Sequence, residues 1–292
     1  MNCLVKEQRP PSKHHYLPSV YLKQFSVDGP TADRKSLIWL LSRHQHKQVP
    51  VESQCYERKF YSAIDSTTTE KMFQHYEDLY RALAQLIWKG HPNRNIREYF
   101  GLMVFIVSLH LRNPAYEVTR MLGPRIEAYK LLESQFIHHY LMGSPDYVAT
   151  PEQQLERLKD FWGVFIYTSA SENQLITSDN PALWFSTGGS GNLDFMILPV
   201  TPNSCAVAYN REAVSLAGNS LSPADVDVLN EAQVKSCLAA LYLDAPFSEQ
   251  NRQESAEFWI RHKPPSGFIN EHEWQPNIID YKGALSFVSV CR

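Results

Sequence analysis

The residues best suited to chemistry begin near the N-terminus, where two histidines are adjacent. His14 and His15 could each transfer a proton, bind a metal or hold an anion when protonated. Because adjacent side chains diverge in any regular element, one imidazole would point into a site and the other away from it. The alternative is structural: a histidine that caps a turn or packs against Tyr21 and Phe25. The spacing alone favours neither explanation.

Two charged residues lie where helical patterns would bury them in part. Glu77 is at the edge of an apolar stripe that contains Phe73 and Tyr80, so its carboxylate needs a cation, a metal or a ligand unless its head reaches water. Arg112 ends the most apolar segment of the chain, where a guanidinium needs a fixed anion. That anion could be Glu77, Asp179 or a ligand phosphate, and a structural ion pair explains the position equally well.

The segment 177–181 has the sequence TSDNP and follows a short predicted strand. Asp179 and Asn180 can bond their own backbone in such a turn, so a structural Asx turn is the simplest explanation. In the functional alternative, Ser178, Asp179 and Asn180 present a hydroxyl, a carboxylate and an amide rigidly at the end of a sheet.

A further amide lies in the clearest helix of the chain. Ser222 and Asp225 form a capping box, with proline at the first helical position, and predict a helix that continues to about Leu241. Asn230 lies in the apolar row of this helix, and a buried amide requires hydrogen-bond partners. It would therefore brace a loop or contact a ligand.

The elements that must position these residues change along the chain. Short β-type segments occupy parts of residues 37–61. Residues of about 69–161 have apolar side chains at every third or fourth position, which predicts a helical middle with helices at 69–89, 95–112, 124–142 and after 150. Five short strands follow one another directly over about 162–210, which predicts an antiparallel meander.

Length and composition limit the class of protein. A chain of 292 residues with 43% hydrophobic and 20% charged residues is neither disordered nor a disulfide miniprotein. We predict a mobile arm over residues 1–13 and a single α+β domain over residues 14–292, in which a helical layer packs against a mostly antiparallel sheet.

Charge and apolar runs bear on partners and location. The net charge of −3 produces no strong global field, although residues 1–50 carry eight Lys and Arg against three acids. That segment is either a solvated surface or a face for a phosphate-bearing ligand. There is no signal-peptide pattern, no apolar run near the ~20 residues of a membrane span, and no CxxC pair among five cysteines. We therefore expect a cytoplasmic protein with reduced thiols and no membrane partner.

Several of these segments together resemble a known family. Residues 14–25, HHYLPSVYLKQF, resemble the HHYxPxxYLxxF signature of the bacterial domain-of-unknown-function family 4238, and residues 177–181 look like its TSDNP motif. Arg112 is similar to the arginine of its R-[TN]-P helix end, residues 198–202 resemble its PLSP segment, and Glu77 and Asn230 fall where the family has a glutamate and an asparagine. The resemblance spans residues 13–245. The family has no established activity, so the resemblance implies a shared set of polar residues and no reaction.

The first functional hypothesis is a hydrolase or a phosphoryl- or nucleotide-handling enzyme. His14 or His15 would act as general acid or base, and Asp179 and Glu77 would orient it or hold a divalent cation such as Mg²⁺ or Mn²⁺. The substrate would be an anionic or phosphate-bearing small molecule or a nucleic acid. The residues that we predict to contact it are Tyr16, Arg112, Ser178, Asn180 and Asn230. This hypothesis requires a pocket that His15 and Asp179 share.

The second hypothesis is a non-catalytic binding or interaction protein, such as a sensor or a toxin-neutralising partner. Here the same residues form a buried hydrogen-bond network. The sequence contains no GxGxxG, P-loop, HExxH or GxSxG motif that would favour a particular reaction.

Overall fold

The computed structural model describes residues 13–29, 35–58, 66–89, 96–113, 158, 160–169, 172–188, 193–261 and 278–291. Within them it is an α+β protein with several mostly antiparallel sheets, as the sequence predicts. The predicted helix at 124–142 lies outside the described residues. Residues 1–12 of the predicted arm over 1–13 also lie outside them, and Lys13 is the first residue of a strand rather than part of an arm. Of the predicted helix after 150, residues 158, 160 and 161 are described, and they are helical.

The N-terminal segment forms short elements that pack into the core. Strand β1 (Lys13–His15) pairs antiparallel with β4 (Tyr56–Arg58), and the chain then turns into helix α1 (Ser19–Leu22) and the 3-10 helix η1 (Lys23–Phe25). The Tyr21 side chain is fully buried, and its hydroxyl lies 2.7 Å from Thr177 Oγ1 and donates to the Pro199 carbonyl at 2.8 Å. The aromatic residues of this segment therefore tie it to the centre of the fold.

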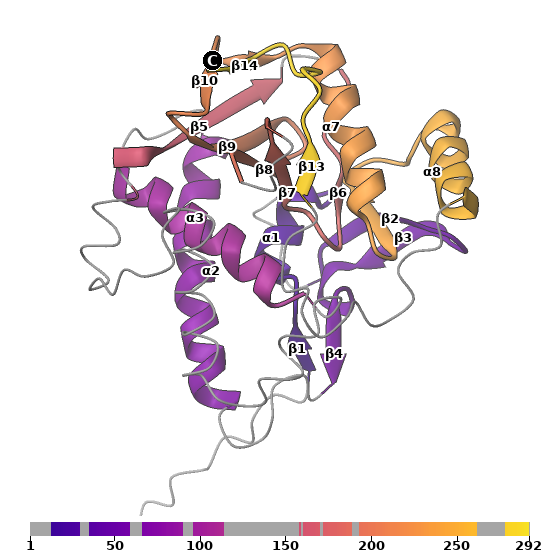
Figure 1. Cartoon of the computed structure of the whole chain (residues 1–292). Helices are drawn as coiled ribbons and strands as arrows, with labels where there is room; N and C mark the ends of the chain where they lie inside the picture. Colours follow the sequence, from indigo (N-terminus) through magenta and orange to yellow (C-terminus); the bar gives the residue numbers. More distant parts are fainter. Residues whose placement is uncertain are drawn as a thin grey trace, which may run out of the picture.

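Two helices form one layer of the molecule. Helix α2 (Ser66–Trp88) and helix α3 (Ile96–Leu111) pack against each other, and Tyr80 and Phe105 stack with ring centroids 4.3 Å apart. Both helices match the predicted apolar periods, although α2 begins three residues earlier than expected. In Figure 1 these two helices lie on one side of the central sheet and helix α7 (Pro223–Ser236) lies on the other.

The central sheet has six strands in the order β11-β5-β9-β8-β7-β13. Its middle pairs are antiparallel, and the edge strands β11 and β13 pair parallel to their neighbours. The strands are β5 (Trp162–Ser169), β7 (Leu183–Ser186), β8 (Phe195–Thr201), β9 (Ser204–Asn210), β11 (Ser220–Leu221) and β13 (Ile278–Asp280). Side chains alternate along β8, since Met196 and Leu198 join the core under α2 and α3, whereas Phe195 and Ile197 join the core under α7.

A second sheet has four strands in the order β3-β2-β12-β6. They are β2 (Leu37–Ser42), β3 (His46–Pro50), β6 (Thr177–Ser178) and β12 (Ala240–Leu243), with the 3-10 helix η2 (Val51–Ser53) after β3. The predicted meander is therefore wrong at one point. The segment around residue 177 leaves the succession of strands, because β12 offers it an antiparallel partner in this other sheet.

The capping box of α7 is confirmed, and the predicted end of the helix is wrong. The Ser222 hydroxyl accepts from the Asp225 N–H at 3.2 Å, and the Asp225 carboxylate accepts from the Ser222 N–H at 2.9 Å. The helix ends at Ser236 instead of about Leu241, since Cys237 is extended and the next residues form β12.

The remaining described elements follow at the surface and the C-terminus. Helix α8 (Glu249–Arg261) comes after β12, and β10 (Val214–Leu216) pairs antiparallel with β14 (Val288–Val290). Within the described residues, we find no helix with both the length and the apolar character that a membrane crossing requires.

Candidate functional site

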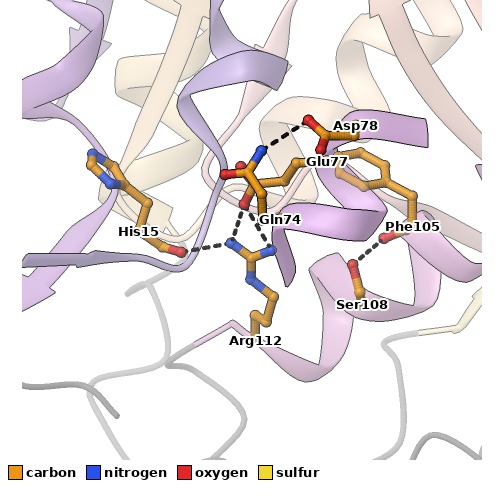
Figure 2. Close-up of polar contacts among 7 residues, drawn as sticks. All are labelled: His15, Gln74, Glu77, Asp78, Phe105, Ser108 and Arg112. Carbon is orange, nitrogen blue, oxygen red and sulfur yellow. Dashed lines mark hydrogen bonds and ion pairs between the residues drawn. The ribbon is translucent and has the colours of Figure 1, made fainter. Parts of the chain in front are cut away.

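Arg112 joins helix α3 to helix α2 and strand β1. One guanidinium nitrogen donates to the His15 carbonyl at 2.7 Å, and the two terminal nitrogens lie 3.2 and 3.3 Å from the same Glu77 carboxylate oxygen. The guanidinium carbon also lies 4.2 Å from the centre of the Phe73 ring. Arg112 is 2% exposed, and Figure 2 shows it between the backbone of β1 and the side chain from α2. The structure thus contains the Arg112–Glu77 ion pair that the sequence offered as one alternative.

The imidazole of His15 is directed away from Arg112, as Figure 2 also shows. Its Nε2 lies 3.2 Å from the Glu52 carbonyl oxygen, and the ring meets Tyr56 edge-on with centroids 5.9 Å apart. The atom of His15 that accepts from the guanidinium is its backbone carbonyl oxygen. His14 takes part in β1 opposite Glu57, and its side chain lies outside the described residues.

Asp179 uses both carboxylate oxygens to hold the turn between α7 and β12. Oδ1 accepts from the Leu238 N–H at 2.9 Å and Oδ2 from the Ala239 N–H at 2.8 Å, while the Asp179 N–H donates to the Ala240 carbonyl at 3.1 Å. Burial raises the pKa of Asp179 from its ordinary value of 3.8 to about 6, although the backbone N–H groups oppose this change. The carboxylate is 4% exposed and acts as a cap within the protein.

The neighbours of Asp179 bind the last turns of α7. The Ser178 hydroxyl donates to Gln233 Oε1 at 2.8 Å, and the Gln233 amide donates to the Pro181 carbonyl at 2.6 Å. The Asn180 amide donates to the Ser236 carbonyl at 3.0 Å. The segment therefore bonds mainly to α7, and its local bond is the one from the Asn180 N–H to the Ser178 hydroxyl at 3.2 Å.

Asn230 braces the chain just before β6. Its Oδ1 accepts from the Ile176 N–H and its Nδ2 donates to the Gln174 carbonyl, both at 2.9 Å. The amide thus satisfies one donor and one acceptor of an irregular segment, which is one of the two roles that its sequence position offered.

Asn113 and Gln233 were not predicted as site residues, yet both bond to the TSDNP segment. Asn113 directly follows Arg112, and its amide lies 3.3 Å from both the Asp179 carbonyl and Asn180 Oδ1. Gln233 lies three positions after Asn230 and so on the same face of α7. That spacing is the signal that could have identified Gln233, and the position of Asn113 before a proline gave no comparable indication.

Tyr16 lies beside a buried thiol. Its N–H donates to the Cys55 carbonyl at 3.0 Å, and the Cys55 sulfur lies 3.2 Å from the Tyr242 hydroxyl. Cys55 has a φ of +51°, which is unusual for a residue with a Cβ. Burial, reinforced by the negative charge of Asp179, raises the pKa of Cys55 to about 12, so this thiol stays protonated and is a poor nucleophile at neutral pH.

A cavity of about 880 Å³ lies between α7, α8 and the ends of β6 and β12. Of the predicted site residues, Asn230 lines it, whereas His15, Asp179, Glu77 and Arg112 are not among its lining residues. In the described part of the chain, no group of three or more His, Cys, Asp or Glu side chains is arranged to hold a metal ion. The predicted Mg²⁺ or Mn²⁺ therefore has no ligand set in these parts of the protein.

The family model described as Protein of unknown function (DUF4238) matches residues 13–244. The chain belongs to this family. The match includes both the contacts of Arg112 and the turn around Asp179, since it extends from β1 through α7 to the end of β12. No curated protein and no solved structure matches the chain.

Proposed function

We propose that this protein is a non-catalytic binding protein whose polar residues hold the fold around a ligand cavity. The observation that carries the proposal is the orientation of the Asp179 carboxylate. Both oxygens accept N–H groups of the protein's own backbone, from Leu238 and Ala239. A carboxylate occupied in this way positions a turn and has little capacity left to activate a substrate.

Other predicted site residues support the same function. The Asn230 amide is bonded at both ends to the chain before β6, and it also lines the cavity. Arg112 is buried against Glu77 and the His15 carbonyl, which explains its charge without a bound phosphate. The contacts of Asn230 attach α7 to the chain before β6, and α7 forms one wall of the cavity.

One observation favours the hydrolase or phosphoryl-handling enzyme as a second candidate. The pKa of Asp179, raised to about 6 by burial, is closer to neutral pH than that of an ordinary aspartate, and such values suit proton transfer. In that function Asp179 would exchange a proton with an anionic substrate or a nucleic acid, and Arg112 would attract the substrate.

The replacement Asp179→Asn separates the two functions. We would compare it with the wild-type protein and with Asp28→Asn, which neutralises an exposed carboxylate away from the cavity. Each protein would be incubated with p-nitrophenyl phosphate, bis-p-nitrophenyl phosphate, ATP and a single-stranded oligonucleotide in Mg²⁺ or Mn²⁺, and its unfolding would be measured in urea.

A binding protein gives no turnover in any of the three proteins, and Asp179→Asn lowers the free energy of unfolding. An enzyme gives turnover in the wild type that Asp179→Asn abolishes while the fold retains its stability. The second result would overturn the proposed function.

A further inference from the structure

The cavity between α7 and α8 has the size of a small-molecule site. Its volume of about 880 Å³ lies within the range of ~300–1,000 Å³ that is typical of ligand pockets. The lining residues on α7 extend from Asp227 to Lys235, and the eight helical steps between them span ~12 Å. In Figure 1 helix α8 lies beside α7, and residues of both helices line the cavity.

The inner surface of the cavity is apolar. Ile176, Leu241, Leu243 and Phe247 line it and belong to a single buried cluster, against which Val234 of α7 packs. The Phe247 N–H donates to His46 Nε2 at 3.3 Å, so the loop that carries this ring is attached to β3. A ligand here would place an apolar body against these side chains.

The outer surface of the cavity is acidic. Four carboxylates line it, against one ammonium group: Glu172, Asp227, Glu231 and Glu257 against Lys235. The ammonium group already pairs with Glu231. Because the carboxylates outnumber the cation, the potential at this opening favours a positively charged ligand and disfavours an anion.

A buried polar atom provides an independent indication of a ligand. Ser255 lines the cavity at 1% exposure, and its hydroxyl has no hydrogen-bond partner among the described residues. Buried polar atoms are normally hydrogen-bonded, and this oxygen can accept from a cation that carries N–H groups.

We propose that this cavity binds a small organic cation, namely an ammonium group on an apolar body. The apolar cluster would take the body, and the carboxylates and the Ser255 hydroxyl would take the N–H groups. This proposal rests on the proposed binding function and adds to it the chemical class of the ligand.

The test uses probes that share one body and differ in charge. We would titrate the full-length protein calorimetrically with 4-phenylbutylamine, 4-phenylbutanol and 4-phenylbutyrate, and with spermidine as a cation without an apolar body. The amine is expected to bind at least tenfold more tightly than the alcohol, and the carboxylate and spermidine are expected to bind more weakly than the amine.

Three variants locate the binding to this cavity. Asp227→Asn combined with Glu231→Gln should weaken amine binding at least fivefold. A control with the same change in net charge, Glu212→Gln combined with Asp280→Asn, should leave it unchanged, because neither residue lines the cavity. Ser255→Ala should weaken amine binding without lowering the midpoint of unfolding, since the hydroxyl that it removes has no partner in the described protein.

The outcomes are distinct from those that test the binding function itself. Equal affinity for the amine, the alcohol and the carboxylate, or the absence of measurable amine binding, would overturn the assignment of a cation while a binding function still stands. Amine binding that both double variants weaken equally would overturn this cavity as the site. Turnover by the wild-type protein that is lost in Asp179→Asn would overturn the binding function, whatever affinity the protein has for the amine.

Discussion

Replacing Asp179 by asparagine separates two effects that oppose each other in this buried carboxylate. Burial disfavours the charged form, whereas the N–H groups of Leu238 and Ala239 favour it. The net result is a pKa raised from 3.8 to about 6. A carboxyl group with a raised pKa in the folded state contributes stability that is fully present below pH ~3.8 and is lost as the pH rises through ~6.

The magnitude follows from the difference between these two pKa values. It corresponds to roughly 3 kcal/mol between the fully protonated and the fully ionised limits. About 2 kcal/mol of this should appear between pH 7.5 and pH 4.5. The asparagine variant cannot titrate at this position, so the stability difference between wild type and Asp179→Asn should widen by about 2 kcal/mol as the pH falls over that interval.

A second loss arises at the two backbone N–H groups that the carboxylate holds. Asparagine has one acceptor oxygen, so either the Leu238 or the Ala239 N–H would face an amide NH₂ group. Losing one hydrogen bond to a charged group costs about 1.5–3 kcal/mol at neutral pH. The variant should therefore be less stable than the wild type throughout the range, and most strongly so at the acidic end.

The assay is urea unfolding of both proteins at pH 7.5, 6.0 and 4.5, with Asp28→Asn as the baseline for neutralising an exposed carboxylate. In a thermal scan the widening corresponds to roughly 3 °C for a chain of this length. A stability difference that stays constant within about 0.5 kcal/mol would show that Asp179 does not titrate differently in the folded and unfolded states. A difference that narrows on acidification would show that the backbone hydrogen bonds outweigh burial, which refutes the reasoning.

Replacements at three other positions test contacts elsewhere in the fold. Arg112→Lys should lower the free energy of unfolding by about 2 kcal/mol, because one ammonium group cannot reach both Glu77 and a backbone carbonyl; a loss below about 0.5 kcal/mol in urea would contradict this. Asn230→Ala should cost about 2–4 kcal/mol and accelerate hydrogen exchange at the Ile176 amide, and unchanged exchange at that amide would count against the bracing role. Ser222→Ala should cost about 1 kcal/mol and Ser222→Gly only a few tenths, as a thermal scan of both would show; equal losses would argue against a capping contribution.

The sequence predicted the elements whose signals are local. The apolar periods located α2 and α3, and the capping box located the start of α7. The pairing of Arg112 with Glu77 and the bracing by Asn230 were among the alternatives offered, since a buried charge or amide must find a partner.

The features that the sequence did not predict depend on distant segments. Residues 237–243, CLAALYL, favour a helix by composition, yet residues 240–243 form a strand because β2 and β6 lie on either side and pair with them. The roles of Asn113 and Gln233 depend on the docking of α3 and α7 against the TSDNP turn, and no local pattern specifies that docking. Whether the predicted site residues contact a ligand stays a prediction.

The place of β12 in the four-stranded sheet has a consequence for the order of folding during translation. Leu241 of β12 pairs with Leu41 of β2, 200 positions earlier in the chain. At ribosomal rates of about 5–20 residues per second, synthesis of the intervening chain takes on the order of 10–40 s, and during this time β2 lacks its neighbour β12. Throughout that interval the edge of β2 that β12 will cover can pair with other chains. A nascent chain that stalls before residue 240 is therefore expected to be a substrate for chaperones, and it would aggregate through this edge when they are depleted.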